Sequence, residues 1–386
     1  MSLLGAPLLV VLSLLAVAAI VMTVLLWPRL AVTAVWTVLG RLGLISLVNA
    51  LVLVLALAVV NHQFQFFGDW SDLIGATTTQ GTVAPAVASA TGGSPTRAVV
   101  ASVAPLLPPP PPSTAVVVAQ DSTSTTYAVT GGSSRITSDV LVILPRGYAD
   151  PANAAHRYPV LEGFGGYPSA VTSTPKSYDL AAQVTGLADQ HVLAPMIAAM
   201  AQPWTPAGRD TECANGPGGA TAGDQAETWI AVDVPAWLRS TFRTRTDRGS
   251  WATWGPSAGA WCAEVAAMLH PDTFGAFISI GGYFRVEWGN WQPYAPSDPR
   301  VARYDLLARA STDPPPVAAW IYTSRQDSQS APTALPFIAA ARAPLAVSAH
   351  VASAGGHRTS LWKPWLPVAL TWLATVSPGF APTARP

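Results

Sequence analysis

The first 68 residues of the chain are almost entirely uncharged. Arg29 and Arg41 are the only Lys, Arg, Asp or Glu residues among them, and they separate two apolar runs, Leu8–Trp27 and Leu42–Val60. At about 1.5 Å per residue, each run is long enough as a helix to cross a hydrocarbon core of about 30 Å. The intervening Leu30–Gly40 would be about 16 Å long as a helix, which is too short to span, and is expected to form the turn. Residues 1–67 are therefore predicted to form a two-helix transmembrane hairpin; two buried helices of a soluble protein are the alternative.

The charge pattern also predicts an orientation for this hairpin. Both arginines lie between the two spans, which by the positive-inside rule puts the turn in the cytoplasm. Everything after Val60 is then expected outside, in a multi-pass protein of the cell membrane. Because no basic residue precedes the first run, a cleaved signal peptide is not expected. Phe64, Phe66, Phe67 and Trp70 follow the second run, as is typical of a membrane interface.

A segment of low complexity follows. Residues 75–112 are mostly Ala, Thr, Gly, Ser, Val and Pro, without helical or strand periodicity, and end in Pro108–Pro112. Such a proline run is an extended spacer of roughly 15 Å. Residues 68–114 are predicted to be a disordered extracytoplasmic linker.

From residue 115 onwards, apolar runs of strand length alternate with stretches of helical periodicity. The predicted strands are, in order, Ala115–Ala119, Tyr127–Thr130, Val140–Leu144, Tyr158–Glu162, His191–Ala199, Ser250–Trp254, Ala276–Gly281, Ala318–Thr323 and Leu345–Val351. The predicted helices are Tyr178–Ala188, Ala226–Phe242 with an interruption at Pro235, Ala258–Leu269 and Pro367–Val376. This alternation predicts an α/β domain over residues 115–380, with a mostly parallel sheet covered by helices on both faces. In such sheets the chemistry lies beyond the carboxyl ends of the strands.

The overall composition narrows the range of functions. Hydrophobic residues make up 50% of the 386 residues and charged residues only 11%. This charged share is less than half of what is usual for a soluble domain, as expected for a chain with membrane segments. The formal net charge is zero, so nothing indicates nucleic-acid binding. Cys213 and Cys262 lack the spacing of a zinc site or a redox motif, and neither a metal nor a cofactor is expected.

A Gly-x-Ser-x-Gly motif, Gly255–Gly259, joins the sixth predicted strand to the helix that begins at Ala258. This spacing is typical of a sharp strand-to-helix turn that exposes a nucleophilic serine, here Ser257. The following helix directs its partial positive end at the serine. The alternative is a chance match, with Ser257 as an ordinary helix N-cap.

Three other informative segments also follow predicted strands. The glycine-rich Gly163-Phe164-Gly165-Gly166 follows the fourth strand, Asp327 follows the eighth, and Gly355-Gly356-His357 follows the ninth. Nucleophile, acid and histidine thus occur in the order Ser, Asp, His, each beyond a strand end, which is the order of an α/β-hydrolase. We expect Ser257 to be the nucleophile, His357 its general base, and Asp327 the carboxylate that holds the imidazole.

Alternatives exist for the acid. Asp327 could be a solvated loop carboxylate, and Asp313, which precedes its strand, is the second candidate.

The glycine-rich segment has a predicted role of its own. The backbone N–H groups of Ala258 and Phe164 are expected to form the oxyanion hole. Gly163 and Gly165 are expected to contact the substrate.

A long loop, Trp204–Gln225, carries Arg209 and Asp210 and is expected to shape substrate entry, unless it is an ordinary surface loop. Cys213 lies in this loop, and Cys262 lies five residues after the nucleophile. An extracytoplasmic location favours oxidation, so a disulfide that pins the loop beside the site is predicted. The alternative is a buried free thiol at Cys262.

The region from about Tyr127 to Val376 resembles the putative-esterase family of α/β-hydrolases, which includes esterase D-like enzymes, enterochelin esterases and secreted mycolyltransferases. The matching segments are Val140–Pro145, Gly147-Tyr148, Tyr158–Gly163, Ala226–Trp229, Asp233–Leu238, Gly255–Gly259, His270–Phe274, and Gly355–His357 followed by Trp362 and Trp365. The resemblance implies an α/β-hydrolase fold and carboxylic ester chemistry. It does not extend to the hairpin, and Glu162 stands where such esterases often have His.

The chain is therefore predicted to be a membrane-anchored serine esterase that acts outside the cell on a small-molecule, lipid or glycolipid ester. A mycolyltransferase-like acyltransferase would use the same residues but pass the acyl group to a sugar hydroxyl. Trp204, Arg209, Asp210 and Trp291 are the candidates for binding that sugar. A non-catalytic envelope protein with a hydrolase-like domain is a further alternative, disfavoured by the intact Ser, Asp and His.

Overall fold

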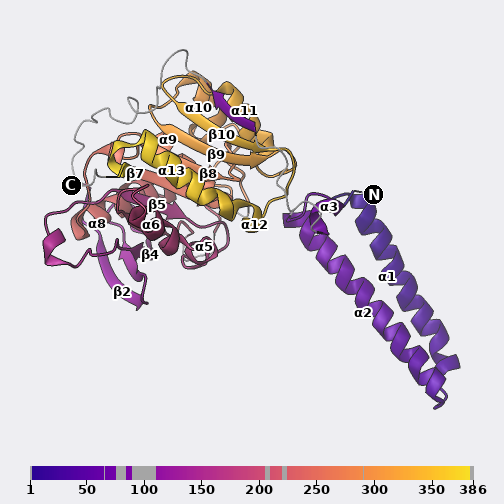
Figure 1. The fold of residues 1–386 in the computed structure, drawn as a ribbon. Coiled ribbons are helices and arrows are strands. Elements are labelled where there is room, and N and C mark those ends of the chain that lie inside the picture. The colour runs from indigo at the N-terminus through magenta and orange to yellow at the C-terminus, as the bar shows by residue number, and fades with distance from the viewer. Residues whose placement is uncertain are drawn as a thin grey trace. The chain divides into compact units, whose positions relative to one another are not determined.

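The structure, a computed structural model, describes residues 2–64, 66–74, 84–88, 110–204, 209–219, 224–289 and 291–382 (Figure 1). The chain divides into two units. The smaller unit contains residues 1–81 together with two loops, 326–328 and 353–358, and the larger unit contains the rest. Most of the predicted linker lies outside the described residues.

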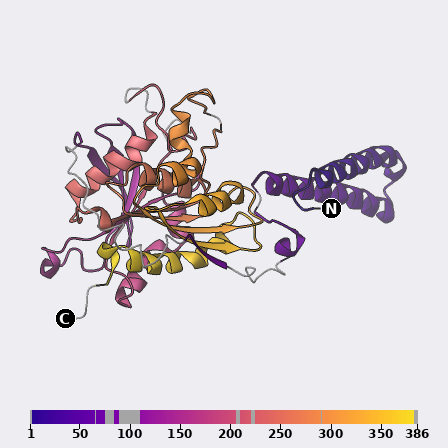
Figure 2. The same cartoon turned by 90° about the horizontal axis from the view of Figure 1, so that it is seen from above.

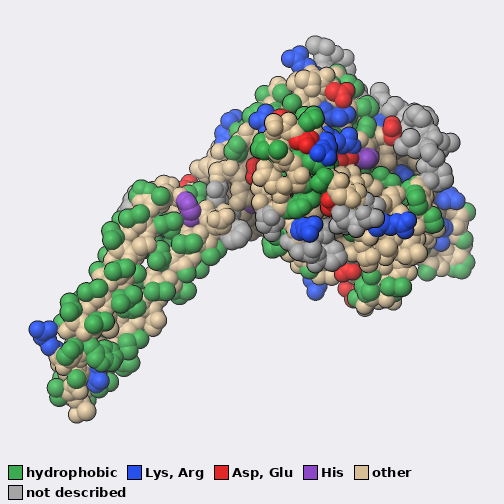
Figure 3. Space-filling view, turned by 180° about the vertical axis from the view of Figure 1, so that it is seen from behind, with side chains coloured by type: hydrophobic (Ala, Val, Ile, Leu, Met, Phe, Trp, Pro, Cys, Tyr) green, Lys and Arg blue, Asp and Glu red, His purple; other side chains and the backbone are tan. Residues whose placement is uncertain are grey.

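The smaller unit contains a helical hairpin. α1 (Ala6–Leu26) packs along α2 (Val35–Phe64), and the 3-10 turn η1 (Trp27–Leu30) begins the connection. Within the described residues, two helical stretches, Ala6–Leu30 and Val35–Gln63, are long and apolar enough to cross a membrane. Their outward surface is largely hydrophobic (Figure 3).

The predicted turn at Leu30–Gly40 is mostly helical in the structure. α2 begins at Val35 and continues without a break into the second predicted span. The physical reason is that this segment is nearly as apolar as the run that follows it and contains no proline to stop a helix. The turn is correspondingly shorter than predicted.

A short helix, α3 (Trp70–Leu73), follows α2 in the part of the chain predicted to be linker. Its N-terminus is capped by Asp69, whose carboxylate accepts a hydrogen bond from the backbone N–H of Asp72 at 2.8 Å. Asp69 thus stabilises a short helix in a part of the chain that was predicted to be linker.

The larger unit is built on a sheet with ten strands among the described residues, in the order β1-β10-β9-β8-β7-β5-β6-β4-β3-β2. The strands are β1 (Ala84–Ala88), β2 (Thr114–Gln120), β3 (Thr125–Thr130), β4 (Thr137–Ile143), β5 (Val160–Phe164), β6 (Ile197–Ala201), β7 (Trp251–Pro256), β8 (Ala276–Ile280), β9 (Ala318–Ser324) and β10 (Ala346–Ala352). The six strands from β10 to β6 are parallel, whereas β4, β3 and β2 at one edge and β1 at the other are antiparallel. β1 was not predicted, because it falls in the linker composition.

Helices cover both faces of this sheet (Figure 2). One face packs against α6 (Leu180–Asp189), which follows α5 (Ser173–Ser177), and against α12 (Thr359–Trp362) and α13 (Leu366–Val376). The other packs against α8 (Val234–Thr241), α9 (Ala258–Leu269), α10 (Leu306–Thr312) and α11 (Ala331–Ala340). Single 3-10 turns lie at Pro151–Asn153, Arg248–Ser250, Val301–Tyr304, Lys363–Trp365 and Pro378–Phe380. The predicted α/β fold with helices on both faces is confirmed.

Two predicted elements differ in detail. β6 begins six residues after the predicted start at His191, whose φ of +56° and the nearby Pro195 are incompatible with an extended central strand. The predicted helix Ala226–Phe242 is α7 (Ala226–Thr228), a π-turn at Trp229–Asp233, and α8. Because Pro235 has no backbone N–H, the helical hydrogen bonding widens just before it.

Candidate active site

The predicted nucleophile lies at a strained turn. Ser257 lies between the buried strand β7 and the first residue of α9, with φ +54° and ψ −130°. Few residues other than glycine adopt a positive φ, and such strain is typical of a nucleophile elbow. The backbone N–H of Ser257 donates to the carbonyl of Ile280 on β8 at 3.0 Å. This bond fixes the turn against the neighbouring strand.

Gly255 and Gly259 are both required because other backbone atoms lie too close to leave room for a side chain. A Cβ atom on Gly255 would lie 2.3 Å from the backbone of Gly259, and one on Gly259 would lie 2.2 Å from the carbonyl oxygen of Phe164. The motif therefore lets the start of α9 pack directly on the end of β5. This contact brings the glycine-rich segment after β5 beside the nucleophile.

The glycine-rich segment lies against Ser257 through Gly166. A Cβ atom built on Gly166 would lie 3.6 Å from the Cβ of Ser257. Ala258 is the first residue of α9, so its N–H has no partner within the helix. Phe164, the other predicted oxyanion donor, is the last residue of β5 and is completely buried. Phe164 was predicted from the sequence, and the structure adds Gly166 as a loop residue beside the serine side chain.

The predicted histidine and acid form a buried pair. Asp327 follows β9, and His357 follows β10. The Nδ1 of His357 lies 3.0 and 2.9 Å from the two carboxylate oxygens of Asp327. His357 is 7% exposed and Asp327 is 1% exposed. A carboxylate on Nδ1 favours the tautomer that leaves Nε2 as the proton acceptor.

The second candidate for the acid, Asp313, and two other histidines, His270 and His350, have other partners or neighbours. Asp313, the residue after α10, is exposed and pairs with Arg309 in that helix at 2.9 Å. His270 pairs with the buried carboxylate of Glu227 at 2.8 Å. The ring of His350 packs near Trp320 and Trp365, and burial lowers its pKa. Among the described residues, Asp327 is thus the carboxylate that contacts His357.

The long loop is bound covalently to the nucleophile helix. Cys213 and Cys262 form a disulfide with a Cα separation of 5.4 Å. Beside it, the indole N–H of Trp261 donates to the carbonyl of Glu212 at 2.7 Å. Arg209 is exposed and Asp210 half-buried, and burial raises the pKa of Asp210. The substrate-binding role of these two residues stays a prediction.

Aromatic residues lie on both the glycine-rich segment and the long loop. Tyr167, directly after Gly166, is 39% exposed and meets the ring of Trp204 edge-on at 5.0 Å. Trp204 itself is 5% exposed, so Tyr167 is the member of this pair that faces solvent. Gly163 and Gly165 are packed against Trp254 and Ser169 rather than open to solvent. Their contact with substrate stays a prediction.

Comparisons with known proteins identify the family and the fold. A family model described as Putative esterase matches residues 134–373. A ferulic acid esterase superposes with a TM-score of 0.55 at 17% identity, covering 69% of this chain and 99% of that one. An S-formylglutathione hydrolase from Agrobacterium tumefaciens superposes with a TM-score of 0.56 at 13% identity, covering 68% and 99%. An uncharacterized protein of Corynebacterium glutamicum is 33% identical over 55 residues, which are 14% of this chain and only 13% of that protein.

At these identities the two solved structures show a shared fold. The family model carries more weight, because it matches more than half of the chain and its range includes Ser257, Asp327 and His357. The chain therefore belongs to the Putative esterase family.

Proposed function

We propose that the chain is a membrane-anchored serine esterase that hydrolyses carboxylic esters outside the cytoplasm. Residues 1–67 act as the anchor, 68–114 as the connecting segment and 115–380 as the catalytic domain. The substrate is a small-molecule, lipid or glycolipid ester. The observation that carries the proposal is the strained nucleophile turn at Ser257, which lies at the same edge of the parallel sheet from which β9 and β10 lead to the buried Asp327–His357 pair.

Each residue of the proposed triad has one chemical role. The Oγ of Ser257 attacks the ester carbonyl carbon while the Nε2 of His357 accepts its proton. Asp327 stabilises the resulting imidazolium. The charge on the carbonyl oxygen is held by backbone N–H groups of Ala258 and of the glycine-rich segment.

The intermediate then collapses in two stages. The C–O bond to the alcohol breaks, and the imidazolium returns its proton to the leaving oxygen, which leaves an acyl ester on Ser257. Water attacks this ester with His357 again as the base, and the acid is released with Ser257 restored. No metal or cofactor takes part in these steps.

The extracytoplasmic location rests on two observations. Arg29 and Arg41 flank the connection between the two apolar helices, which favours a cytoplasmic turn. The disulfide between Cys213 and Cys262 fits an oxidising compartment. Both termini of the hairpin, and the catalytic domain, are then on the outer side.

One experiment tests chemistry and location together. Intact cells and lysed cells are treated with a membrane-impermeant fluorophosphonate, which phosphonylates activated serines. Equal labelling of the wild-type chain in both samples is expected, with complete loss in Ser257→Ala. Ser311→Ala, which removes a hydroxyl from α10, serves as the matched control and should label normally. Full labelling of Ser257→Ala would refute the nucleophile, and labelling only after lysis would refute the location.

A further inference from the structure

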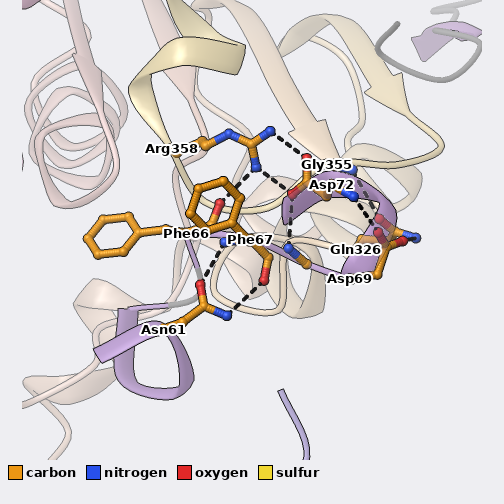
Figure 4. Close-up of polar contacts among 9 residues, drawn as sticks. Asn61, Phe66, Phe67, Asp69, Asp72, Gln326, Gly355 and Arg358 are labelled. Atoms are coloured by element: carbon orange, nitrogen blue, oxygen red, sulfur yellow. Dashed lines mark hydrogen bonds and ion pairs between the residues drawn. The ribbon is translucent and has the colours of Figure 1, made fainter. Parts of the chain in front are cut away.

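The chain that leaves α2 folds onto the two loops that carry Asp327 and His357 (Figure 4). We call residues 66–73 the juxtamembrane segment. Asn61, in the last turn of α2, fixes its start. The side-chain amide of Asn61 donates to the carbonyl of Phe67 at 3.1 Å, and its oxygen accepts from the N–H of Phe67 at 2.9 Å. The end of the second apolar helix is thus joined directly to this segment.

The segment contacts the histidine loop through Arg358, the residue after His357. The guanidinium of Arg358 forms a two-point ion pair with the carboxylate of Asp72. It also donates to the carbonyl of Phe66 at 2.9 Å and lies 4.8 Å from the ring centre of Phe67. The side chains of Asp72 and Arg358 are 2% and 15% exposed. A pair this far from water is costly to break from one side, because the remaining charge stays buried.

The segment contacts the acid loop through Gln326, the residue before Asp327. The amide of Gln326 donates to the carboxylate of Asp69 at 3.3 Å. Its oxygen accepts from the N–H of Gly355 at 3.1 Å, which ties the acid loop to the histidine loop. A Cβ atom on Gly68 would lie 3.4 Å from Gln326, so the segment fits closely at this point. Both catalytic loops are therefore held by residues adjacent to the catalytic ones.

We propose that the juxtamembrane segment positions the catalytic pair, with Asp72 acting through Arg358 on His357 and Asp69 acting through Gln326 on Asp327. This inference rests on the proposed function, because it takes His357 as the base. Proton transfer requires the imidazole to be held within a fraction of an ångström of its productive position. The bond between His357 and Asp327 orients the ring, but the direction of the two loops is set by contacts outside the pair. The anchor is thus part of the catalytic machinery as well as a tether.

The test uses the full-length chain in detergent micelles and p-nitrophenyl acetate as substrate. Four variants are compared with the wild type: Asp72→Asn, Arg358→Gln, the double variant, and Arg285→Gln. The last removes an exposed ion pair with Asp305 on the larger unit and is the matched control. Rates are normalised to active sites titrated with a fluorophosphonate, so that misfolded protein does not count.

Asp72→Asn and Arg358→Gln should each lower kcat about 10-fold or more with KM within about 2-fold, because an interaction used for catalysis has been lost. The double variant should be no worse than the single variants, since both remove one unit. Arg358→Lys, which keeps the charge but loses the two-point geometry, should be intermediate. Arg285→Gln should match the wild type.

Other outcomes overturn the inference. Unchanged kcat per titrated site in Asp72→Asn and Arg358→Gln, with only a lower melting temperature, would make the contact purely structural. Additive losses in the double variant would show that the two residues act separately. If Ser257→Ala also retained activity, the proposed function itself would fail, which separates the two ideas.

Discussion

The disulfide between Cys213 and Cys262 gives a prediction whose size follows from the structure. The two cysteines are 49 residues apart. In the chain-entropy model, closing a loop of about 50 residues in the unfolded state stabilises the fold by about 4 kcal/mol. With an unfolding entropy of about 2.1 cal/mol/K per residue over a domain of about 270 residues, loss of the bond should lower the melting temperature by about 7 °C.

The experiment must distinguish the contribution of the disulfide bond to stability from the contribution of the packing of the two sulfur atoms. Both cysteines are completely buried, so Cys213→Ala with Cys262→Ala would also leave small cavities and lose more stability than the bond alone contributes. Reduced wild-type protein keeps both sulfur atoms. The informative comparison is therefore the oxidised wild type against the same protein unfolded and refolded with a reductant, and the double alanine variant should melt below both.

Tryptophan fluorescence measures the melting temperature, and alkylation of the denatured chain counts free thiols. We expect no free thiols in the oxidised protein. A difference of less than about 2 °C between oxidised and reduced protein would refute the loop-closure argument. Free thiols in freshly purified protein would refute the bond.

Two further predictions follow from single contacts, and a third tests whether water or a sugar accepts the acyl group. Gly259→Ala should abolish activity and lower stability, because its Cβ would lie 2.2 Å from the carbonyl oxygen of Phe164. As a control, Gly186→Ala in α6, where a Cβ would meet nothing within 4 Å, should stabilise the fold by about 1 kcal/mol. Urea unfolding measures the stability of both variants, and ester turnover measures their activity. Burial alone would raise the pKa of Glu227, but hydrogen bonds from His270 and Arg303 lower it to about 2 from 4.5, so its carboxylate stabilises the fold by about 3 kcal/mol above pH 4.5 and this contribution disappears as the pH falls towards 2. Glu227→Gln should therefore be less stable than the wild type at pH 7 and equal to it near pH 2, and a difference independent of pH would contradict this. Trehalose added to the esterase assay should leave free acid as the main product, and preferential formation of acylated sugar would make the chain an acyltransferase.

The elements that were predicted correctly are those that a local sequence pattern specifies. α9 has its predicted bounds, Ala258–Leu269, because a strand, a glycine motif and an alanine-rich helix follow one another without a gap. The family resemblance and the α/β-hydrolase fold are confirmed for the same reason, since they rest on the alternation of strands and helices. The start of β6 was wrong by six residues, because composition cannot show that His191 has a positive φ. His191 and Ser257 are two of the six described residues other than glycine that have a positive φ. Of these two, only Ser257 lies between glycines whose spacing predicts a turn.

The predicted site residues likewise divide into those that a sequence pattern places and those that no pattern places. Ser257, Asp327 and His357 could be proposed because each follows a strand, and parallel strands end at one edge of a sheet. The substrate roles of Arg209 and Asp210 had no comparable basis, since a loop has no periodicity that fixes where its side chains point. Gly166 was missed as the neighbour of Ser257 because four glycine-loop residues in a row offer the same backbone, and only the packing of α9 on β5 decides which one lies against the serine.

The contacts of the juxtamembrane segment could not be predicted from the sequence for a different reason. Asp72 and Arg358 are 286 residues apart, and each is an ordinary charged residue in its own neighbourhood. The aromatic residues around Asp72 follow an apolar span, and this pattern predicts a membrane interface equally well whether the segment is free or docked. In the structure Phe66 and Trp70 remain exposed, at 41% and 46%, while Phe67 lies under the guanidinium of Arg358. The carboxylate of Asp72 and the ring of Phe67, which lie between these two residues in the sequence or beside them, contact Arg358 on the loop that holds His357. A substitution at Asp72 should therefore change catalysis without changing membrane attachment.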